Sequence, residues 1–302
     1  MRLVKNYSNK RSVILKTLII YNPKSGKGEI TQKIDDICLY LKKYEVSVFY
    51  SSFEKEITSY LFLNSHRFDI VIIFGGDGTL HEAINGIMKC TVRPKILYIP
   101  SGSVNDFAKY IKINKNYKLH LALLEQEPNE IDVYEICGEY FIYTIGCGKF
   151  SNISYDKRFY FLKKYLKRFF YYFKLFKDLF VKHKYKIEII CDGKRITGYY
   201  FMFLFLAINN VAGFKVNGAN NKINDGKIKL YLFKYKKYLS IISMMFFFIY
   251  KKKNNSFILE IEGTEFNIKS PNLLKLNLDG EGPFFKSDFE VKVIPNALKI
   301  YY

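Results

Sequence analysis

The sequence predicts an α/β domain with a parallel sheet, followed by a β-rich domain. In the first part of the chain, short apolar runs alternate with segments in which apolar residues recur at helical spacing. Three of these apolar runs end in loops rich in Gly, Ser, Asn and Asp. An alternating βαβα order implies right-handed crossovers and a parallel sheet. From about residue 131 onward, strand-like runs predominate, which favours a sandwich.

The first domain is expected to cover residues 17–130, after a basic lead-in at residues 1–16. Its expected elements, in order, are strand 18–21, helix 29–43, strand 46–50, helix 54–64, strand 71–74, helix 82–88, strand 96–99, and helices 105–110 and 119–124. The helix at 29–43 is predicted because Ile30, Ile34 and Ile37 share one helical face. Thr79 is expected to cap or begin the helix that follows the third strand.

The second domain is expected to cover residues 131–302. Its expected strands are 140–145, 186–190, 199–208, 227–233, 257–261, 266–269, 273–278, 289–294 and 298–301. Asp192-Gly193 indicates a hairpin turn between two of them. Two basic and aromatic helical insertions, at 155–184 and 236–253, interrupt the strand pattern.

Either insertion could lie in the plane of an anionic bilayer. The alternative is that their apolar faces pack on the β domain while the lysines are solvated. The apolar run at 238–250 is shorter than the roughly twenty residues of a membrane span. Because that run has little polar face, burial is the favoured interpretation for the second insertion.

Three loops follow the predicted parallel strands, and their composition suits an anionic ligand. They are Asn22-Pro23-Lys24-Ser25-Gly26, Gly75-Gly76-Asp77-Gly78-Thr79, and Gly102-Ser103-Val104-Asn105-Asp106. Loops at the carboxyl ends of parallel strands share one edge of the sheet. Glycines let backbone N–H groups approach a phosphate, and a helix N-terminus adds positive partial charge. A tight strand-to-helix turn without a ligand is the alternative interpretation of the second loop.

The composition narrows the class of partner. The 302 residues carry a formal net charge of +20, which favours a nucleotide, a nucleic acid or an acidic membrane surface. The five cysteines are scattered and lack a C-x-x-C spacing, so they are expected to be reduced core residues of a cytosolic protein. The basic N-terminus is not followed by an uninterrupted apolar core, so no signal peptide is expected.

These loops suit a nucleotide site, and a site that transferred a phosphoryl group would need a phosphate cradle, a cation and a base. Asp77 and Asp106 can hold Mg²⁺ directly or through water. An acidic turn, Asp279-Gly280-Glu281, follows a later apolar strand. Paired carboxylates raise the pKa of one member, which suits a general base. An ordinary acidic hairpin turn remains the alternative on these residues alone.

The order and spacing of these motifs resemble the diacylglycerol kinase-like lipid kinases, which include the sphingosine and ceramide kinases. The resemblance runs from about Leu18 to the C-terminus. Its further pieces are Ile131-Asp132, Asn224-Asp225-Gly226, Leu278-Asp279-Gly280-Glu281 and Pro295-Asn296-Ala297-Leu298. The resemblance implies a Rossmann-like, NAD-kinase-like first domain, ATP and Mg²⁺ as cofactors, and a lipid with a free hydroxyl as acceptor.

The resemblance also implies roles for individual residues. It makes Glu281 the base, with Asp279 and Asp77 as further catalytic residues. The residues implied to bind ATP are Asn22, Pro23, Lys24, Ser25, Gly26, Ser51, Gly75, Gly76, Asp77, Gly78, Thr79, Leu80, His81, Glu82, Gly102, Ser103, Asn105 and Asp106. A structural Mg²⁺ is implied at Asp225, with backbone carbonyls that would be those of Lys222 and Lys227. Lys149 departs from the family pattern, so recognition of the acceptor is left open.

The function expected from the sequence is therefore transfer of the γ-phosphoryl group of ATP to a lipid hydroxyl. Diacylglycerol, giving phosphatidic acid, is the first acceptor considered, and a sphingoid base or ceramide is the second. A non-catalytic protein that binds lipid or nucleic acid on this scaffold is a different possibility, although no nucleic-acid-binding motif is present. The expected location is the cytoplasm, peripherally at the inner face of an anionic membrane.

Overall fold

The structure is a computed structural model that describes residues 14–23, 29–113, 116–148, 184–211, 214–216, 221–236, 247 and 257–302. Most of the basic lead-in and nearly all of both helical insertions lie outside these residues. The chain forms two compact units. Unit 1 comprises Met1–Ile142, Ile223–Gly226 and Ile294–Tyr302, and unit 2 comprises Tyr143–Lys222 and Lys227–Val293.

This division differs from the predicted boundary after residue 130. The hairpin of β5 (Asn129–Ile136) and β6 (Glu139–Phe141) belongs to unit 1, because β6 packs against helix α3 (Asp77–Met88). Two segments that are distant in sequence also return to unit 1. A sequence pattern shows where strands are, but it does not show that the chain re-enters an earlier unit.

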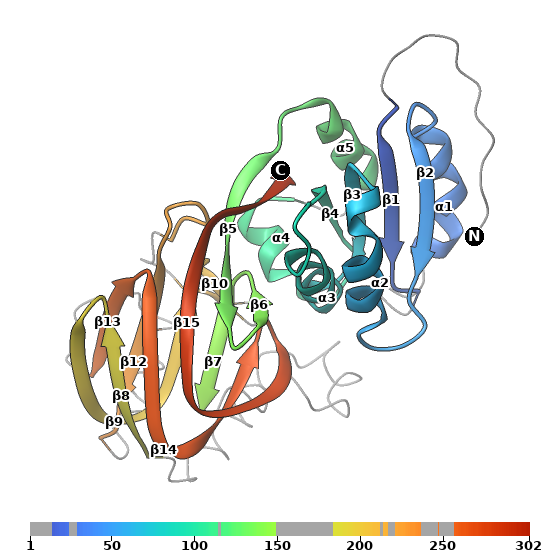
Figure 1. The fold of residues 1–302 in the computed structure, drawn as a ribbon. Coiled ribbons are helices and arrows are strands. Elements are labelled where there is room, and N and C mark those ends of the chain that lie inside the picture. Colours follow the sequence, from blue (N-terminus) through green and yellow to red (C-terminus); the bar gives the residue numbers. More distant parts are fainter. Residues whose placement is uncertain are drawn as a thin grey trace, which may run out of the picture. The chain divides into compact units, whose positions relative to one another are not determined.

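Unit 1 is built on strands that pair in parallel. They are β1 (Lys16–Tyr21), β2 (Glu45–Tyr50), β3 (Ile70–Gly75) and β4 (Lys95–Pro100), in the order β2-β1-β3-β4 (Figure 1). At the C-terminal end of β15 (Glu281–Tyr301), Ile300 and Tyr301 extend this sheet by pairing in parallel with β4. Every residue of β3 is buried, as expected of a strand covered on both faces.

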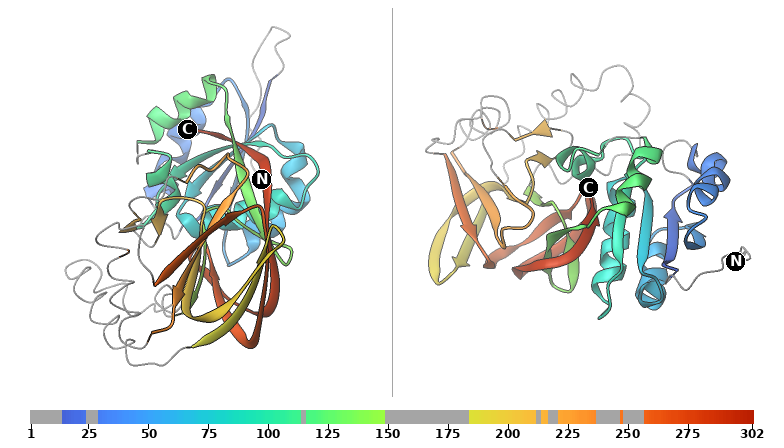
Figure 2. Two further views of the ribbon diagram at one scale, coloured as in Figure 1. Left: turned by 90° about the vertical axis from the view of Figure 1, so that its left-hand side faces the viewer. Right: turned by 90° about the horizontal axis from the view of Figure 1, so that it is seen from above.

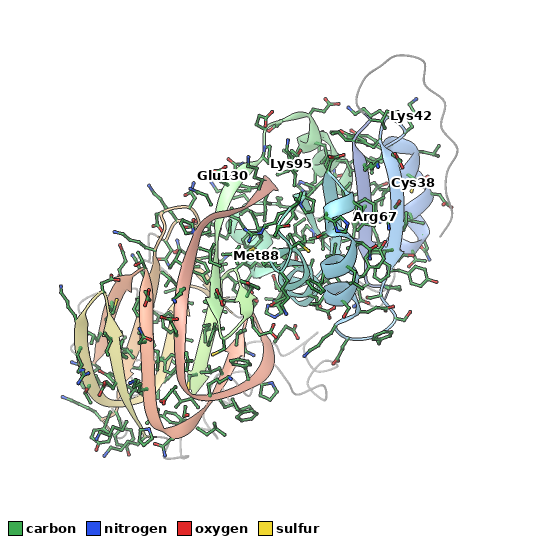
Figure 3. The ribbon with its side chains drawn as sticks, viewed as in Figure 1. Cys38, Lys42, Arg67, Met88, Lys95 and Glu130 are labelled. Atoms are coloured by element: carbon green, nitrogen blue, oxygen red, sulfur yellow. The ribbon has the colours of Figure 1, made fainter. Side chains whose placement is uncertain are left out.

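Helices cover this sheet. Helix α1 (Glu29–Tyr40), α5 (Tyr117–Leu121) and the following 3₁₀ helix η3 (Ala122–Glu125) pack on one core cluster with β1, β3 and β4. Helix α2 (Glu56–Asn64), which continues into η2 (Ser65–Arg67), packs against α3. A short helix, α4 (Asp106–Tyr110), follows β4. Figure 3 shows the side chains, with Met88 at the end of α3 and Lys95 at the start of β4.

Unit 2 is β-rich, and its strands pair antiparallel. They are β7 (Thr144–Gly148), β8 (Tyr185–Cys191), β9 (Lys194–Leu206), β12 (Ile228–Lys234), β13 (Ile258–Gly263), β14 (Glu265–Leu278) and the first part of β15 (Figure 2). The long strands β9 and β14 each pair with both β8 and β7. The short strands β10 (Asn210–Val211) and β11 (Phe214–Lys215) pair separately.

Several predicted elements differ in extent from the observed ones. The segments predicted as separate strands at 266–269 and 273–278 form the single strand β14, which carries a register shift between Lys269 and Leu274. The hairpin predicted at Asp192-Gly193 joins β8 to β9, and both residues have positive φ, 45° and 80°. Among the described residues, no helix combines the length and the apolar character needed to cross a bilayer.

Candidate active site

The glycine loop after β3 leads directly into α3. The helix begins at Asp77, with Gly76 as its N-cap in an extended conformation. Thr79 therefore lies inside the first turn and is buried, which corrects the expectation that it caps or begins the helix. Leu80 is fully buried, and its N–H donates to the Gly76 carbonyl at 3.1 Å, so its side chain belongs to the core.

The loop after β4 touches the first glycine loop through backbone atoms. A Cβ on Gly102 would lie 2.6 Å from the Gly76 Cα and 2.7 Å from Asn105 Oδ1. Asn105 has a left-handed φ of 52°, and its Nδ2 donates to the Gly102 carbonyl at 2.8 Å. A side chain at position 102 would therefore push the loops apart, whereas a Cβ on Gly76 would make a tight contact of 3.3 Å with the Gly102 Cα.

Asp77 connects the first glycine loop to α4. Its Oδ2 accepts the N–H of Asp106 at 3.1 Å, and its Oδ1 accepts that of Phe107 at 3.4 Å. Asp106 is itself buried, and its Oδ1 lies 3.6 Å from Lys109 Nζ. The structure thus brings together the two carboxyl-bearing residues that were predicted to hold Mg²⁺.

The donor set of Asp77 and Asp106 can be compared with what Mg²⁺ prefers. Mg²⁺ takes one or two carboxylates together with phosphate oxygens and water, not a cage made wholly of protein atoms. Two neighbouring carboxylates beside glycine loops fit that preference. No cluster of three or more His, Cys, Asp or Glu side chains with metal-binding geometry occurs in the described part of the chain.

The other predicted ATP contacts are described only in part. Asn22 and Pro23 follow β1, while Lys24, Ser25 and Gly26 lie outside the described residues. Ser51 is buried, and its N–H donates to the Tyr21 carbonyl at 3.1 Å, which places it beside the end of β1. Ser103 is exposed in the loop after β4.

His81 is held by a residue that the sequence pattern did not single out. The Nδ2 of the buried Asn85 lies 3.3 Å from His81 Nε2 and donates to the Tyr140 carbonyl at 2.8 Å. Its Oδ1 accepts the Tyr140 N–H, also at 2.8 Å. Asn85 therefore satisfies both backbone groups of an inner residue of β6 and orients the imidazole one helical turn away. Its position on the helix was its only sequence signal.

Asp132 joins three segments of unit 1. Its N–H donates to the Ile223 carbonyl at 2.6 Å, and its carboxylate accepts the N–H groups of Gly226 at 2.7 Å and Asn296 at 2.9 Å. Burial, followed by the nearby Asp225 charge, raises the pKa of Asp132, although the backbone hydrogen bonds oppose this shift. Asp132 belonged to a recognised motif, but the sequence assigned it no role.

The predicted metal residues fall in different units. Asp225 belongs to unit 1, whereas Lys222 and Lys227 belong to unit 2. The Lys227 Nζ lies 3.2 Å from Glu262 Oε1 on β13, so its charge is paired within unit 2.

The acidic turn of unit 2 gives its two carboxylates different environments. Asp279 is 1% exposed, and its Oδ1 accepts the N–H groups of Tyr143 at 2.9 Å and Thr144 at 3.0 Å. The Tyr143 hydroxyl donates to the Asp279 carbonyl. Glu281, in contrast, is exposed. Asp279 therefore ties the turn to β7.

Comparison with known proteins identifies the family. The family model for the diacylglycerol kinase catalytic domain matches residues 16–136. A diacylglycerol kinase of Staphylococcus aureus (strain bovine RF122 / ET3-1) is 30% identical over 269 residues, covering 87% of this chain and 85% of the relative. The chain belongs to the diacylglycerol kinase family. A diacylglycerol kinase of Bacillus subtilis (strain 168) is 29% identical, covering 87% of this chain and 88% of that protein.

Solved structures of the family share the fold. A diacylglycerol kinase from Bacillus anthracis str. Sterne superposes with a TM-score of 0.79 at 20% identity, covering 97% of this chain and 98% of that chain. Membership of the diacylglycerol kinase family makes this protein a lipid kinase, a transferase that takes its phosphoryl group from ATP.

Proposed function

We propose that this diacylglycerol kinase family member phosphorylates diacylglycerol to phosphatidic acid. The observation that carries the proposal is the backbone contact between the Gly76 and Gly102 loops, which sets Asp77 beside Asp106. The identity of the acceptor is supported by the names of the relatives, which are called diacylglycerol kinases. In the reaction, the lipid oxygen bonds to the γ-phosphorus, the bond from that phosphorus to the β,γ-bridging oxygen breaks, and ADP leaves.

The phosphates of ATP would lie against the glycine loops of unit 1. Backbone N–H groups and the N-terminus of α3 attract them there, because the twelve-residue helix directs its positive end to the loop. Further hydrogen bonds to ATP would come from five polar residues, namely Asn22, Ser51, His81, Ser103 and Asn105. Leu80 contributes through packing, which keeps the first turn of α3 in place.

Asp77 and Asp106 would hold Mg²⁺ in the complex with ATP. With the cation bound, the charge that develops on the transferring phosphoryl group is spread over more centres. Asp77 also keeps the start of α4 in position through its two backbone hydrogen bonds. A second Mg²⁺, of structural role, is proposed at Asp225.

Glu281 is the proposed general base, which takes the proton from the lipid hydroxyl. Its exposure leaves the carboxylate accessible to a substrate. Asp279 would act by holding the turn that presents Glu281, because its Oδ1 is already engaged by two backbone N–H groups.

We further infer that unit 1 is Rossmann-like and resembles NAD kinase, and that the strands of unit 2 form a sandwich. Parallel pairing with helical cover supports the first inference, and the buried alternate positions of β8 and β14 support the second. The net charge of +20 supports action at an anionic, cytoplasmic membrane surface, to which the protein would bind peripherally.

The test is phosphate transfer from radiolabelled ATP to dispersed diacylglycerol, monoacylglycerol, ceramide and sphingoid base, with Mg²⁺ present. Wild type is expected to yield labelled phosphatidic acid, and Glu281→Gln is expected to lose at least about a hundredfold in kcat, the lower range for a general base. Glu265→Gln, at an exposed glutamate at the start of β14, serves as the control.

Each outcome bears on a separate part of the proposal. Label on a sphingoid product alone would overturn the acceptor assignment. A folded Glu281→Gln variant with the turnover of the Glu265→Gln control would overturn the assignment of the base. Transfer that survives complete removal of divalent cations would overturn the proposed cation site.

A further inference from the structure

The buried side chain of Tyr98 contacts both glycine loops. It belongs to β4, is 0% exposed, and is among the largest fully buried side chains of the protein. Its hydroxyl donates to the Gly75 carbonyl at 3.3 Å and lies 3.5 Å from Asn105 Oδ1. One hydroxyl therefore reaches the loop after β3 and the loop after β4.

The partners of Tyr98 are the groups that define the spacing of the loops. The Gly75 carbonyl also accepts the Ser101 N–H at 2.8 Å, so it is already tied to the second loop. Asn105 contacts Tyr98 through Oδ1 and the Gly102 carbonyl through Nδ2. Gly102 in turn rests on Gly76. Tyr98 and Asn105 thus close a ring of contacts that runs through both loops.

The chemistry of the site keeps the Tyr98 hydroxyl protonated. Burial, and then the charges of Asp77 and Asp106, raise its pKa well above the ordinary value of a tyrosine. The hydroxyl therefore stays a neutral hydrogen-bond donor throughout the pH range of a kinase assay. The Phe107 ring, whose centroid lies 6.3 Å from that of Tyr98, packs beside it and limits its movement.

We propose that Tyr98 is a positioning residue for ATP binding. Its hydroxyl contacts the Gly75 carbonyl and Asn105 Oδ1, and thereby fixes the distance between the two phosphate-binding loops. It touches neither phosphate nor lipid in this proposal, and it acts through Gly75 and Asn105. The proposal rests on the proposed function, because it assigns the loops to ATP. Phenylalanine at position 98 would keep the packing of the ring and remove only the donor.

The experiment is steady-state kinetics of Tyr98→Phe with ATP as the varied substrate. We expect the KM for ATP to rise roughly fivefold, the order expected for one lost buried hydrogen bond, while kcat stays within about twofold. Tyr231→Phe removes the hydroxyl of another buried tyrosine, in β12 of unit 2, and is expected to leave the KM for ATP unchanged. A Tyr98→Phe variant with the wild-type KM would overturn the proposal.

A double-mutant cycle separates positioning from a general loss of stability. Asn105→Gly removes the side-chain partner and tolerates the positive φ. Because the bond to the Gly75 carbonyl remains in Asn105→Gly, Tyr98→Phe in that background is expected to raise the KM for ATP still, but by a smaller factor than in wild type. Full additivity of the two substitutions would overturn the link. Absence of any phosphate transfer by wild type would overturn the proposed function instead, so the two failures are distinguishable.

Discussion

Asp279 and Glu281 are two residues apart on one turn, and their environments assign them different work. The Asp279 carboxylate is enclosed and accepts two backbone N–H groups, whereas the Glu281 carboxylate is exposed. A buried acceptor that is satisfied by backbone amides holds structure, while an exposed carboxylate can exchange a proton with a substrate. The turn therefore separates a structural carboxylate from the proposed catalytic one.

Replacing Asp279 with alanine is expected to lower the free energy of unfolding. The N–H groups of Tyr143 and Thr144 would lose their acceptor, at a cost of about 2–4 kcal/mol for the pair. The positive φ of 50° at position 279 is also less favourable for alanine than for aspartate. Urea denaturation measures this change. Asp288→Ala, at an exposed aspartate of β15, should change stability by less than about 0.5 kcal/mol. Equal stabilities of the two variants would contradict the structural role of Asp279.

At the scale of elements, the two glycine loops form one structural unit, because the two strand-to-helix connections are in backbone contact. The ends of β3 and β4 are aligned by parallel pairing, with Gly75 opposite Pro100. Asp77 then reaches from the start of α3 to the start of α4. A change in the position of one loop is therefore expected to shift the other loop.

Gly102→Ala is expected to weaken ATP binding at least tenfold while the protein stays folded. A methyl group at position 102 would meet the Gly76 Cα at 2.6 Å and would push the loops apart. Such misplacement costs affinity because the phosphate contacts depend on loop spacing. Calorimetric titration with a non-hydrolysable ATP analogue measures the effect. Gly146→Ala, whose Cβ would meet Leu204 at an ordinary 3.4 Å, is the matched control. Equal affinity in both variants would refute the close contact.

The sequence predicted the existence and order of elements in unit 1 because their periodicities are local properties. It placed the glycine loops at strand ends, and β1, β3 and β4 lie within a few residues of the predicted ranges. It did not predict Tyr98 or Asn85 as site residues, because their roles come from contacts between different elements. It also divided β14 into two strands, because Pro271 interrupts the strand pattern in the sequence, close to the register shift between Lys269 and Leu274.

At the scale of the whole molecule, the excess of 20 positive charges sets the kind of surface that the protein approaches. Positively charged proteins are attracted to anionic bilayers. Salt screens this attraction over about 10 Å at 0.1 M. The proposed lipid acceptor resides in such a bilayer. Attraction of the whole chain would then raise the local concentration of enzyme at its substrate.

Binding to vesicles that contain anionic phospholipid is expected to be strong at low salt and to fall at least tenfold by 0.5 M salt. Co-sedimentation with vesicles of neutral phospholipid alone gives the comparison. Equal binding to neutral and anionic vesicles would show that charge does not recruit the protein. Salt-independent binding to anionic vesicles would lead to the same conclusion.

The return of residues 294–302 to unit 1 has a consequence for synthesis of the protein. Ile300 and Tyr301 pair with β4, and the Asn296 N–H donates to Asp132, so β4 and Asp132 lack these partners until residues 294–302 have been synthesised. When only the first half of the chain has been synthesised, the glycine loops are present but the end of β15, which pairs with β4, is not. In a nascent chain, the edge of β4 that Ile300 and Tyr301 cover therefore stays without this partner strand until residues 294–302 have left the ribosome.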